Sequence, residues 1–270
     1  MVDRFDSTHT VSDLEYFFPI VSQTSLIDKL FLLRTMRLVR NTGAYNYLEI
    51  GSFRGGSLAP FLMDPACKTI LSIDDRGRVQ PDERGINYDY TGFTSQLMLD
   101  ELHRNNISTD KLRTFDGSIN ELDANYAASF DLAFIDGEHT DEACFRDFLW
   151  TFPLMKPNSI IVFHDSNLIY KSLKIIMVYL DKAKAGYTFF KAANSGMSAL
   201  IFGNYRASDR IEYLGVKQDD QSVFFAESEA CRIKEQFRNR ARVRFVPSKI
   251  LKLQIPLAVD IRAPKASKQV

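Results

Sequence analysis

The chain of 270 residues is poor in the features that mark secreted and membrane-spanning proteins. It has only three cysteines, Cys67, Cys144 and Cys231, which lie far apart and form no paired motif. A scattered, odd-numbered set argues against a disulfide framework and predicts reduced thiols in a cytosolic setting. No stretch approaches the roughly 18 apolar residues of a membrane span. We therefore expect a cytoplasmic protein that does not act in a membrane.

An excess of charge of either sign is also missing. The 34 basic residues balance the 34 acidic ones, so the overall charge gives no reason to expect nucleic acid or an anionic membrane as the main partner. The expected substrate is instead a small molecule that is neutral or held by a metal ion. Hydrophobic residues make up 45% of the chain, which is sufficient for a large buried core.

Strand-like apolar runs alternate with helical segments through the middle of the chain. This alternation is typical of an α/β fold, a Rossmann-like doubly wound sheet whose strands are mostly parallel. Two apolar runs, 187–191 and 197–202, flank Asn-Ser-Gly and predict a closing antiparallel hairpin. The predicted parallel strands are 45–50, 69–74, 111–115, 130–135 and 159–164, and the predicted helices are 56–63, 94–105, 119–127, 142–152 and 168–184.

Three further segments flank or interrupt this core. Residues 1–44 are predicted to form an N-terminal helical cover, with a helix from Val11 to about Arg40. Residues 205–270 are predicted to be a C-terminal extension with a basic helix at about 225–240, which is either a solvated face or oligomer contact, or a site for an acidic partner. Residues 75–92 form a long charged connection, which is either a lid over the site or a surface insertion.

The strongest local motif is YLEIGSFRGGS, residues 47–57. Its pattern is a short strand, a glycine-rich turn and the start of a helix, which brings backbone N–H groups close to a cofactor. A side chain at Gly51, Gly55 or Gly56 would block the turn or fill the ligand's space. The motif predicts a nucleotide-like ligand, although many α/β proteins carry such a turn.

Ligands of a doubly wound sheet bind beyond the carboxyl ends of its strands, so the residues at those ends are the candidate site. The second strand ends at Asp74 and Asp75. An acidic residue at this position fits a ribose diol, or serves as a turn residue or helix cap. The third strand leads into Asp116, Gly117 and Ser118, a turn and N-cap that is also compatible with contact to an adenine ring.

The fourth and fifth strands end in FIDGEH and VFHDS, which place Asp136 and Asp165 at neighbouring strand tips. Two carboxylates with the further donors His164, Ser166 and Asn167 suit a hard divalent ion such as Mg²⁺. His164 is a poorer ligand for Mg²⁺ and favours Mn²⁺ or another borderline ion. His139 follows Asp136 by three residues and either accepts a proton from a substrate or caps the next helix.

In this order, YLEIGSFRGGS, SIDD, DGS, FIDGEH and VFHDS, followed by an antiparallel hairpin, resemble the class I S-adenosylmethionine-dependent methyltransferases, specifically the metal-dependent small-molecule O-methyltransferases. The pattern is most similar to the macrocin and mycinamicin sugar O-methyltransferases, and more distantly to the catechol and caffeoyl-CoA O-methyltransferases. The resemblance covers roughly residues 45–204. It implies methyl transfer from S-adenosylmethionine to a hydroxyl of a sugar or another natural-product diol, assisted by a divalent metal expected to be Mg²⁺.

The resemblance also implies a role for each matched position. His139 stands where these enzymes place their general base. His164 stands where the sugar enzymes tend to have an acidic ligand, and Ser166 where the catechol enzymes have Asn. The implied metal ligands are Asp136, His164 and Asp165, and the implied cofactor-binding residues are Glu49, Gly51, Ser52, Gly55, Ser57, Asp74, Asp75, Gly117, Ser118 and Asp136.

Two other functions are compatible with parts of this pattern. A nicotinamide dehydrogenase would share the fold type, but the glycine spacing is not GxGxxG and the closing hairpin is unlike its two mononucleotide halves. A catalytically inactive protein that recruits a partner through its basic helix would still bind S-adenosylmethionine. The sequence does not identify the methyl acceptor, and the added helices are candidates for a homo-oligomer contact.

Overall fold

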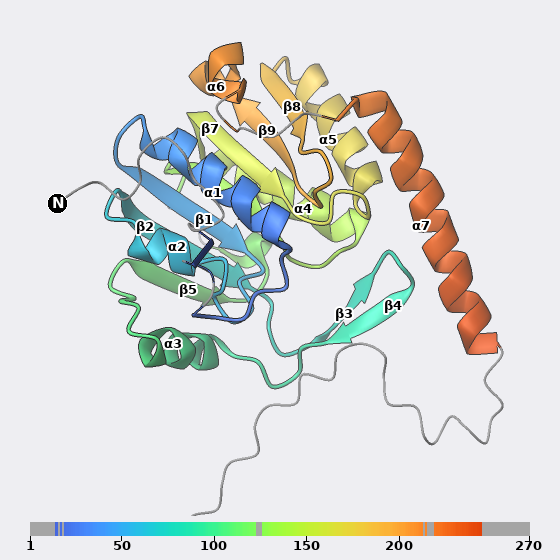
Figure 1. Ribbon diagram of the computed structural model, residues 1–270, viewed down its shortest axis with the longest axis horizontal. Coiled ribbons are helices and arrows are strands. Elements are labelled where there is room, and N and C mark those ends of the chain that lie inside the picture. Colours follow the sequence, from blue (N-terminus) through green and yellow to red (C-terminus); the bar gives the residue numbers. More distant parts are fainter. Residues whose placement is uncertain are drawn as a thin grey trace, which may run out of the picture.

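The computed structural model describes residues 14, 15, 17, 19–122, 126–212, 214 and 219–244. A seven-stranded sheet with the order β5-β2-β1-β6-β7-β9-β8 forms its centre (Figure 1). Five strands are parallel, whereas β9 runs antiparallel to both β7 and β8. The predicted strands and closing hairpin are therefore confirmed. The strands are β1 (Tyr45–Ile50), β2 (Cys67–Asp74), β5 (Leu112–Asp116), β6 (Phe130–Ile135), β7 (Met155–Phe163), β8 (Tyr187–Lys191) and β9 (Ser198–Phe202).

Helices cover both faces of the sheet. Because successive side chains of a strand point to opposite faces, Tyr47 and Leu132 belong to one core, and their neighbours Leu48 and Ala133 to the other. The first core packs against α1 (Leu26–Arg40), α2 (Ala59–Met63) and α3 (Ser95–Arg104), and the second against α4 (Asp141–Thr151), α5 (Tyr170–Lys182) and α7 (Gln221–Arg244). The remaining helical segments are η2 (Ile119–Glu121), η3 (Phe152–Leu154), η4 (Gly203–Arg206) and α6 (Ser208–Glu212).

Two predicted helices differ from the structure. The N-terminal helix begins at Leu26 rather than at Val11, because Ser25 caps it in a capping box with Asp28. The predicted helix 119–127 is wrong in its first part, where a single 3₁₀ turn ends at Leu122 in extended backbone. Residues 123–125 of that prediction lie outside the described residues, as does the end of the C-terminal extension, 245–270.

The long connection after β2 contains regular structure. It forms a two-stranded antiparallel hairpin, β3 (Val79–Asp82) and β4 (Ile86–Asp89), which is separate from the main sheet (Figure 1). Helix α7 contacts the turn of this hairpin through Arg232, Gln236 and Asn239. No helix in the described part of the chain is long and apolar enough to cross a membrane.

Candidate active site

A cavity of about 710 Å³ opens at the carboxyl ends of the parallel strands. Its volume is within the range of about 300–1,000 Å³ that is typical of cofactor and small-molecule sites. Its position at the carboxyl ends is the one predicted for a doubly wound sheet. The wall consists of residues 21–23, the turn after β1, the end of β2 with Arg76, the β3–β4 hairpin with Tyr90, Thr91 and Phe93 after it, and the ends of β6 and β7.

Gly51 begins the turn after β1 and lies directly against the backbone that follows β6. Its φ is +87°, and a Cβ at this position would lie 2.0 Å from the backbone oxygen of Asp136. The space that Gly51 leaves is thus occupied by the backbone that follows β6, not by a ligand. Ser52 and Gly56 line the cavity with Gly51, whereas Gly55 is not part of its wall and faces Met98 and Leu102 of α3.

Glu49 is buried beneath the cavity wall instead of lining it. Its carboxyl group accepts hydrogen bonds from Tyr47 Oη at 2.6 Å and from Ser57 Oγ at 2.5 Å. Burial raises the pKa of Glu49 to about 8, although these hydrogen bonds oppose the change. Ser57 does line the cavity, so Glu49 can influence a ligand only through Ser57.

Asp74 lies on the cavity wall at the end of β2, as predicted. One of its oxygens accepts a hydrogen bond of 2.7 Å from Phe53 N and lies 3.6 Å from Arg76 Nε. Burial raises the pKa of Asp74, while the positive charge of Arg76 lowers it. Arg76, which the sequence reasoning missed, also bonds Asp116 at 2.8 Å and has a side chain only 3% exposed.

Three other predicted cofactor residues lie beside the cavity instead of on its wall. Asp75, Gly117 and Ser118 border a separate hollow of about 20 Å³. Asp75 pairs with Arg78 at 2.5 Å. Contact of Gly117 or Ser118 with an adenine ring therefore stays a prediction.

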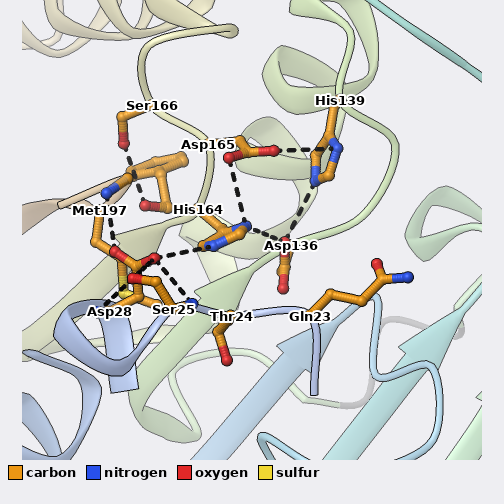
Figure 2. Close-up of polar contacts among 12 residues, drawn as sticks. Gln23, Thr24, Ser25, Asp28, Asp136, His139, His164, Asp165, Ser166 and Met197 are labelled. Atoms are coloured by element: carbon orange, nitrogen blue, oxygen red, sulfur yellow. Dashed lines mark hydrogen bonds and ion pairs between the residues drawn. The ribbon is translucent and has the colours of Figure 1, made fainter. Parts of the chain in front are cut away.

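The ends of β6 and β7 bring Asp136, His139 and His164 together (Figure 2). Asp136 Oδ1 lies 2.8 Å from His164 Nδ1 and 3.3 Å from His139 Nε2. One potential ligand atom from each residue lies within 4.8 Å of the other two. Nδ1 of His164 is buried and has no hydrogen-bond partner among the described residues. A carboxylate and nitrogen donors that converge in this way fit a divalent metal ion.

Asp165 stands next to this group rather than within it. Its Oδ1 lies 3.9 Å from His164 Nδ1, and its Oδ2 lies 3.4 Å from His139 Nδ1. Asp165 adopts a left-handed backbone conformation with φ +46°, which is uncommon for a residue other than glycine and is frequent at functional sites.

The two histidines are surrounded by carboxylates on both sides. His139 Nδ1 also lies 3.4 Å from Asp82 of β3, and His164 Nε2 lies 3.7 Å from Asp28 of α1. Burial by itself lowers the pKa of His139, but the contacts with Asp136, Asp82 and Asp165 raise it to about 9. Burial likewise opposes the protonation of His164, but Asp136 and Asp28 raise its pKa well above the ordinary value.

The segment after the hairpin and the turn after β1 supply an aromatic wall that the sequence reasoning did not identify. Phe53, in the turn after β1, contacts Phe93 and Tyr90 at ring-centroid distances of 4.8 and 5.6 Å. All three line the cavity. Tyr90 Oη lies 3.5 Å from Gln23 Oε1, so the segment after β4 meets the segment before α1 across the cavity. This contact supports the lid interpretation of residues 75–92.

The comparisons with known proteins agree with this geometry. Residues 48–166 match a family model described as a methyltransferase domain. A curated relative, Uncharacterized protein R132 of Acanthamoeba polyphaga mimivirus, is 26% identical over 119 residues, which are 44% of this chain and 50% of the relative. The chain thus matches about half the length of this relative.

Two solved structures have a similar fold. The O-methyltransferase NovP gives a TM-score of 0.52 at 10% identity, covering 68% of this chain and 84% of NovP. The calicheamicin methyltransferase CalS11 gives a TM-score of 0.50 at 18% identity, covering 66% of this chain and 79% of CalS11. The chain therefore has the class I fold of S-adenosylmethionine-dependent methyltransferases, and its residues 48–166 are similar to a methyltransferase domain. The reversed β9 also distinguishes its sheet from that of a nicotinamide dehydrogenase.

Proposed function

We propose that the protein transfers the methyl group of S-adenosylmethionine to a hydroxyl group of a small molecule, a sugar or another natural-product diol. The observation that carries this proposal is a single cavity with two chemically different ends. The glycine turn, Ser57 and Asp74 follow β1 and β2, and Asp136, His139 and His164 follow β6 and β7, so the strand order places the two groups at different ends of the cavity. The first end suits a nucleoside with an amino acid group, and the second suits activation of a hydroxyl.

The donor end is supported by groups that match the parts of S-adenosylmethionine. The carboxylate of Asp74 can accept hydrogen bonds from a ribose diol. The Ser57 hydroxyl already donates to Glu49, so the donors for the carboxylate of the methionine part are backbone N–H groups of the turn, with Ser57 beside them. The rings of Phe53 and Phe93 provide an apolar surface next to Asp74.

At the acceptor end we assign proton removal to His139. Its side chain is 18% exposed and reaches the cavity, and Asp82 and Asp165 orient it from the Nδ1 side. The other nitrogen, Nε2, lies 3.3 Å from Asp136 Oδ1, and the surrounding carboxylates raise the pKa of His139 to about 9 in the absence of a metal. A divalent ion bound to Asp136 would release Nε2 for the substrate and lower this pKa, as a histidine base requires. His164 is less exposed, at 9%, and is assigned to metal binding with Asp136 and Asp165.

Proton and methyl transfer then balance without any other reactant. His139 takes the hydroxyl proton, the substrate oxygen forms a bond to the methyl carbon, and the bond from that carbon to sulfur breaks with its electron pair remaining on sulfur. A divalent ion bound by Asp136 and His164 would lower the pKa of the substrate hydroxyl. The protein's own contribution is to align the two reactants and exclude water beneath the hairpin.

The test is transfer of a labelled methyl group from S-adenosylmethionine to a panel of sugars and diols by the full chain, with divalent metal and after chelation. His139→Gln is expected to reduce kcat by about 10²- to 10⁴-fold and to leave metal binding intact. The matched control is His103→Gln on α3, an exposed histidine outside the cavity, which should be as active as the unmodified protein.

Three results would contradict the proposal in different ways. Undiminished turnover in chelator would exclude metal assistance. Loss of metal binding in His139→Gln would make this histidine a ligand instead of a base. Donor binding without transfer to any hydroxyl compound would favour an inactive cofactor-binding protein.

A further inference from the structure

Asp28 lies in the first turn of α1, outside the segment that matches the methyltransferase domain. It is only 4% exposed. Its Oδ2 accepts a hydrogen bond of 2.6 Å from Ser25 Oγ, and its Oδ1 accepts hydrogen bonds from Ser195 Oγ at 2.5 Å and Gly196 N at 2.8 Å. These bonds fix the carboxylate between α1 and the turn that joins β8 to β9.

A buried carboxylate with this many donors has a fixed position and direction. The remaining group near Asp28 is the ring of His164, whose Nε2 lies 3.7 Å from Oδ2 (Figure 2). His164 belongs to the end of β7, so the contact joins the N-terminal helix to the site across a long stretch of chain. This distance is that of an ion pair rather than of a hydrogen bond, so Asp28 favours the ring orientation in which Nε2 of His164 faces its carboxylate.

The orientation of His164 determines where its other nitrogen points. With Nε2 directed toward Asp28, Nδ1 faces Asp136 Oδ1 at 2.8 Å, but the two atoms are not aligned for a hydrogen bond. Two donors bound at about 2.1 Å to one ion, at right angles, would be about 3.0 Å apart. The separation of Nδ1 and Oδ1, 2.8 Å, is close to that of two such ligands, so both atoms can bind one ion with little movement.

The loop after β7 is held by the same turn. Ser166 N donates to Gly196 O at 2.8 Å, and Ser166 Oγ donates to Ser198 Oγ at 2.8 Å. Because Gly196 N in turn donates to Asp28, the helix, the turn and the loop that carries His164 form one connected unit. A small displacement of α1 would be transmitted to the metal-binding pair.

We propose that Asp28 is a positioning residue which holds His164 as a nitrogen ligand, and that the site of Asp136 and His164 therefore prefers a borderline ion such as Mn²⁺, Co²⁺ or Zn²⁺ to Mg²⁺. Imidazole ligands suit borderline ions, whereas Mg²⁺ is bound mainly through oxygen. A carboxylate on the outer nitrogen of a histidine ligand fixes the ring and increases its basicity. The inference deepens the proposed function, since it names the class of ion at the same site.

The experiment measures metal binding alone, with the full chain and neither methyl donor nor acceptor, so it can fail independently of methyl transfer. Co²⁺ and Mg²⁺ are titrated by calorimetry, and the visible absorption of bound Co²⁺ reports nitrogen ligation. The unmodified protein should bind Co²⁺ at least about tenfold more tightly than Mg²⁺. Absence of Co²⁺ binding, or equal affinity for the two ions, would overturn the inference.

Two variants test the residues. Asp28→Asn should weaken Co²⁺ binding by about 10- to 100-fold, and His164→Asp should lower the ratio of Co²⁺ to Mg²⁺ affinity and change the Co²⁺ spectrum. The matched control is Asp100→Asn at an exposed position of α3, whose Co²⁺ affinity should stay within about twofold of the unmodified protein. Ser25→Ala removes the cap of α1 and one of the hydrogen bonds to Asp28 but keeps the carboxylate, so it should weaken Co²⁺ binding less than Asp28→Asn does.

Thermal unfolding of each variant identifies those that fold, and only folded protein is titrated. Unchanged Co²⁺ affinity in Asp28→Asn would overturn the positioning role. An unchanged ion preference in His164→Asp would overturn the assignment of His164 as the selective ligand. Equal losses of affinity in Ser25→Ala and Asp28→Asn would show that only the stability of α1 matters, and would also contradict the proposal.

Discussion

The buried carboxyl group of Glu49 predicts that the stability of the cofactor-free protein falls as pH rises. Glu49 is 0% exposed, and its pKa is raised from 4.5 to about 8. Between these two values the unfolded chain has lost this proton while the folded chain keeps it. The free energy of unfolding must therefore decrease with pH over this window, by about 1.4 kcal/mol for each pH unit from this group alone. The loss reaches about 5 kcal/mol by pH 8.

Replacement of Glu49 by Gln removes this titration and retains a neutral group of similar shape. The amide can accept a hydrogen bond from Tyr47 or Ser57 and donate one to the other, as the protonated acid does. The variant should have a stability close to that of the unmodified protein at pH 5. Above pH 5, the free energy of unfolding of Glu49→Gln should exceed that of the unmodified protein by about a further 1.4 kcal/mol for each pH unit, and the difference should become constant above about pH 8.

The assay is urea unfolding of both proteins at pH 5, 6, 7, 8 and 9, from which the difference in free energy of unfolding is plotted against pH. Glu142→Gln, at an exposed position in the first turn of α4, is the control for the substitution itself. A pH-independent difference for Glu49→Gln would refute the argument that this carboxyl is buried as a neutral acid.

Two further changes test parts of the frame. Gly51→Ala should prevent folding or reduce the free energy of unfolding by several kcal/mol, because its Cβ would meet the backbone of Asp136. In the control, Gly92→Ala, the backbone has φ +89° but the space around it is open, so the cost in urea unfolding should be only about 1–2 kcal/mol. Equal losses of stability in the two variants would contradict the predicted clash at Gly51. Arg232→Gln should reduce the free energy of unfolding by about 2–3 kcal/mol, because its two acidic partners lose their counter-charge. Arg238 is 56% exposed and has one ion pair, so Arg238→Gln should change the free energy of unfolding by less than about 0.5 kcal/mol. Similar losses in the two arginine variants would contradict the stabilising role of the buried ion pairs of Arg232 with Glu83 and Asp141.

The sheet was predictable from sequence because its central strands β1, β6 and β7 contain continuous apolar runs that become buried on both faces. The β3–β4 hairpin was not, because VQPD and INYD have little apolar character. Its turn is bonded to α7, which lies about 150 residues later in the chain. Contacts of this separation leave no local pattern in the sequence.

The candidate site was predictable to the extent that topology alone determines it. The ends of neighbouring parallel strands must meet, and Asp136, His139, His164 and Asp165 are indeed close together. The positions of Glu49 and Gly55 were not predictable in this way, since a motif gives the type of residue but not whether it faces the cavity or the core. Asp28 and Asp82 escaped the sequence reasoning because each belongs to a segment outside the motifs.

Binding of S-adenosylmethionine tests the central claim most directly, since it requires neither an acceptor nor a choice of metal. Asp74 faces the cavity, and the next residue, Asp75, lies off its wall. Calorimetric titration of the full chain should show binding that Asp74→Asn weakens by about tenfold or more and that Asp75→Asn leaves unchanged. No binding by the unmodified protein, or equal effects of the two substitutions, would contradict the assignment of this cavity as the donor site.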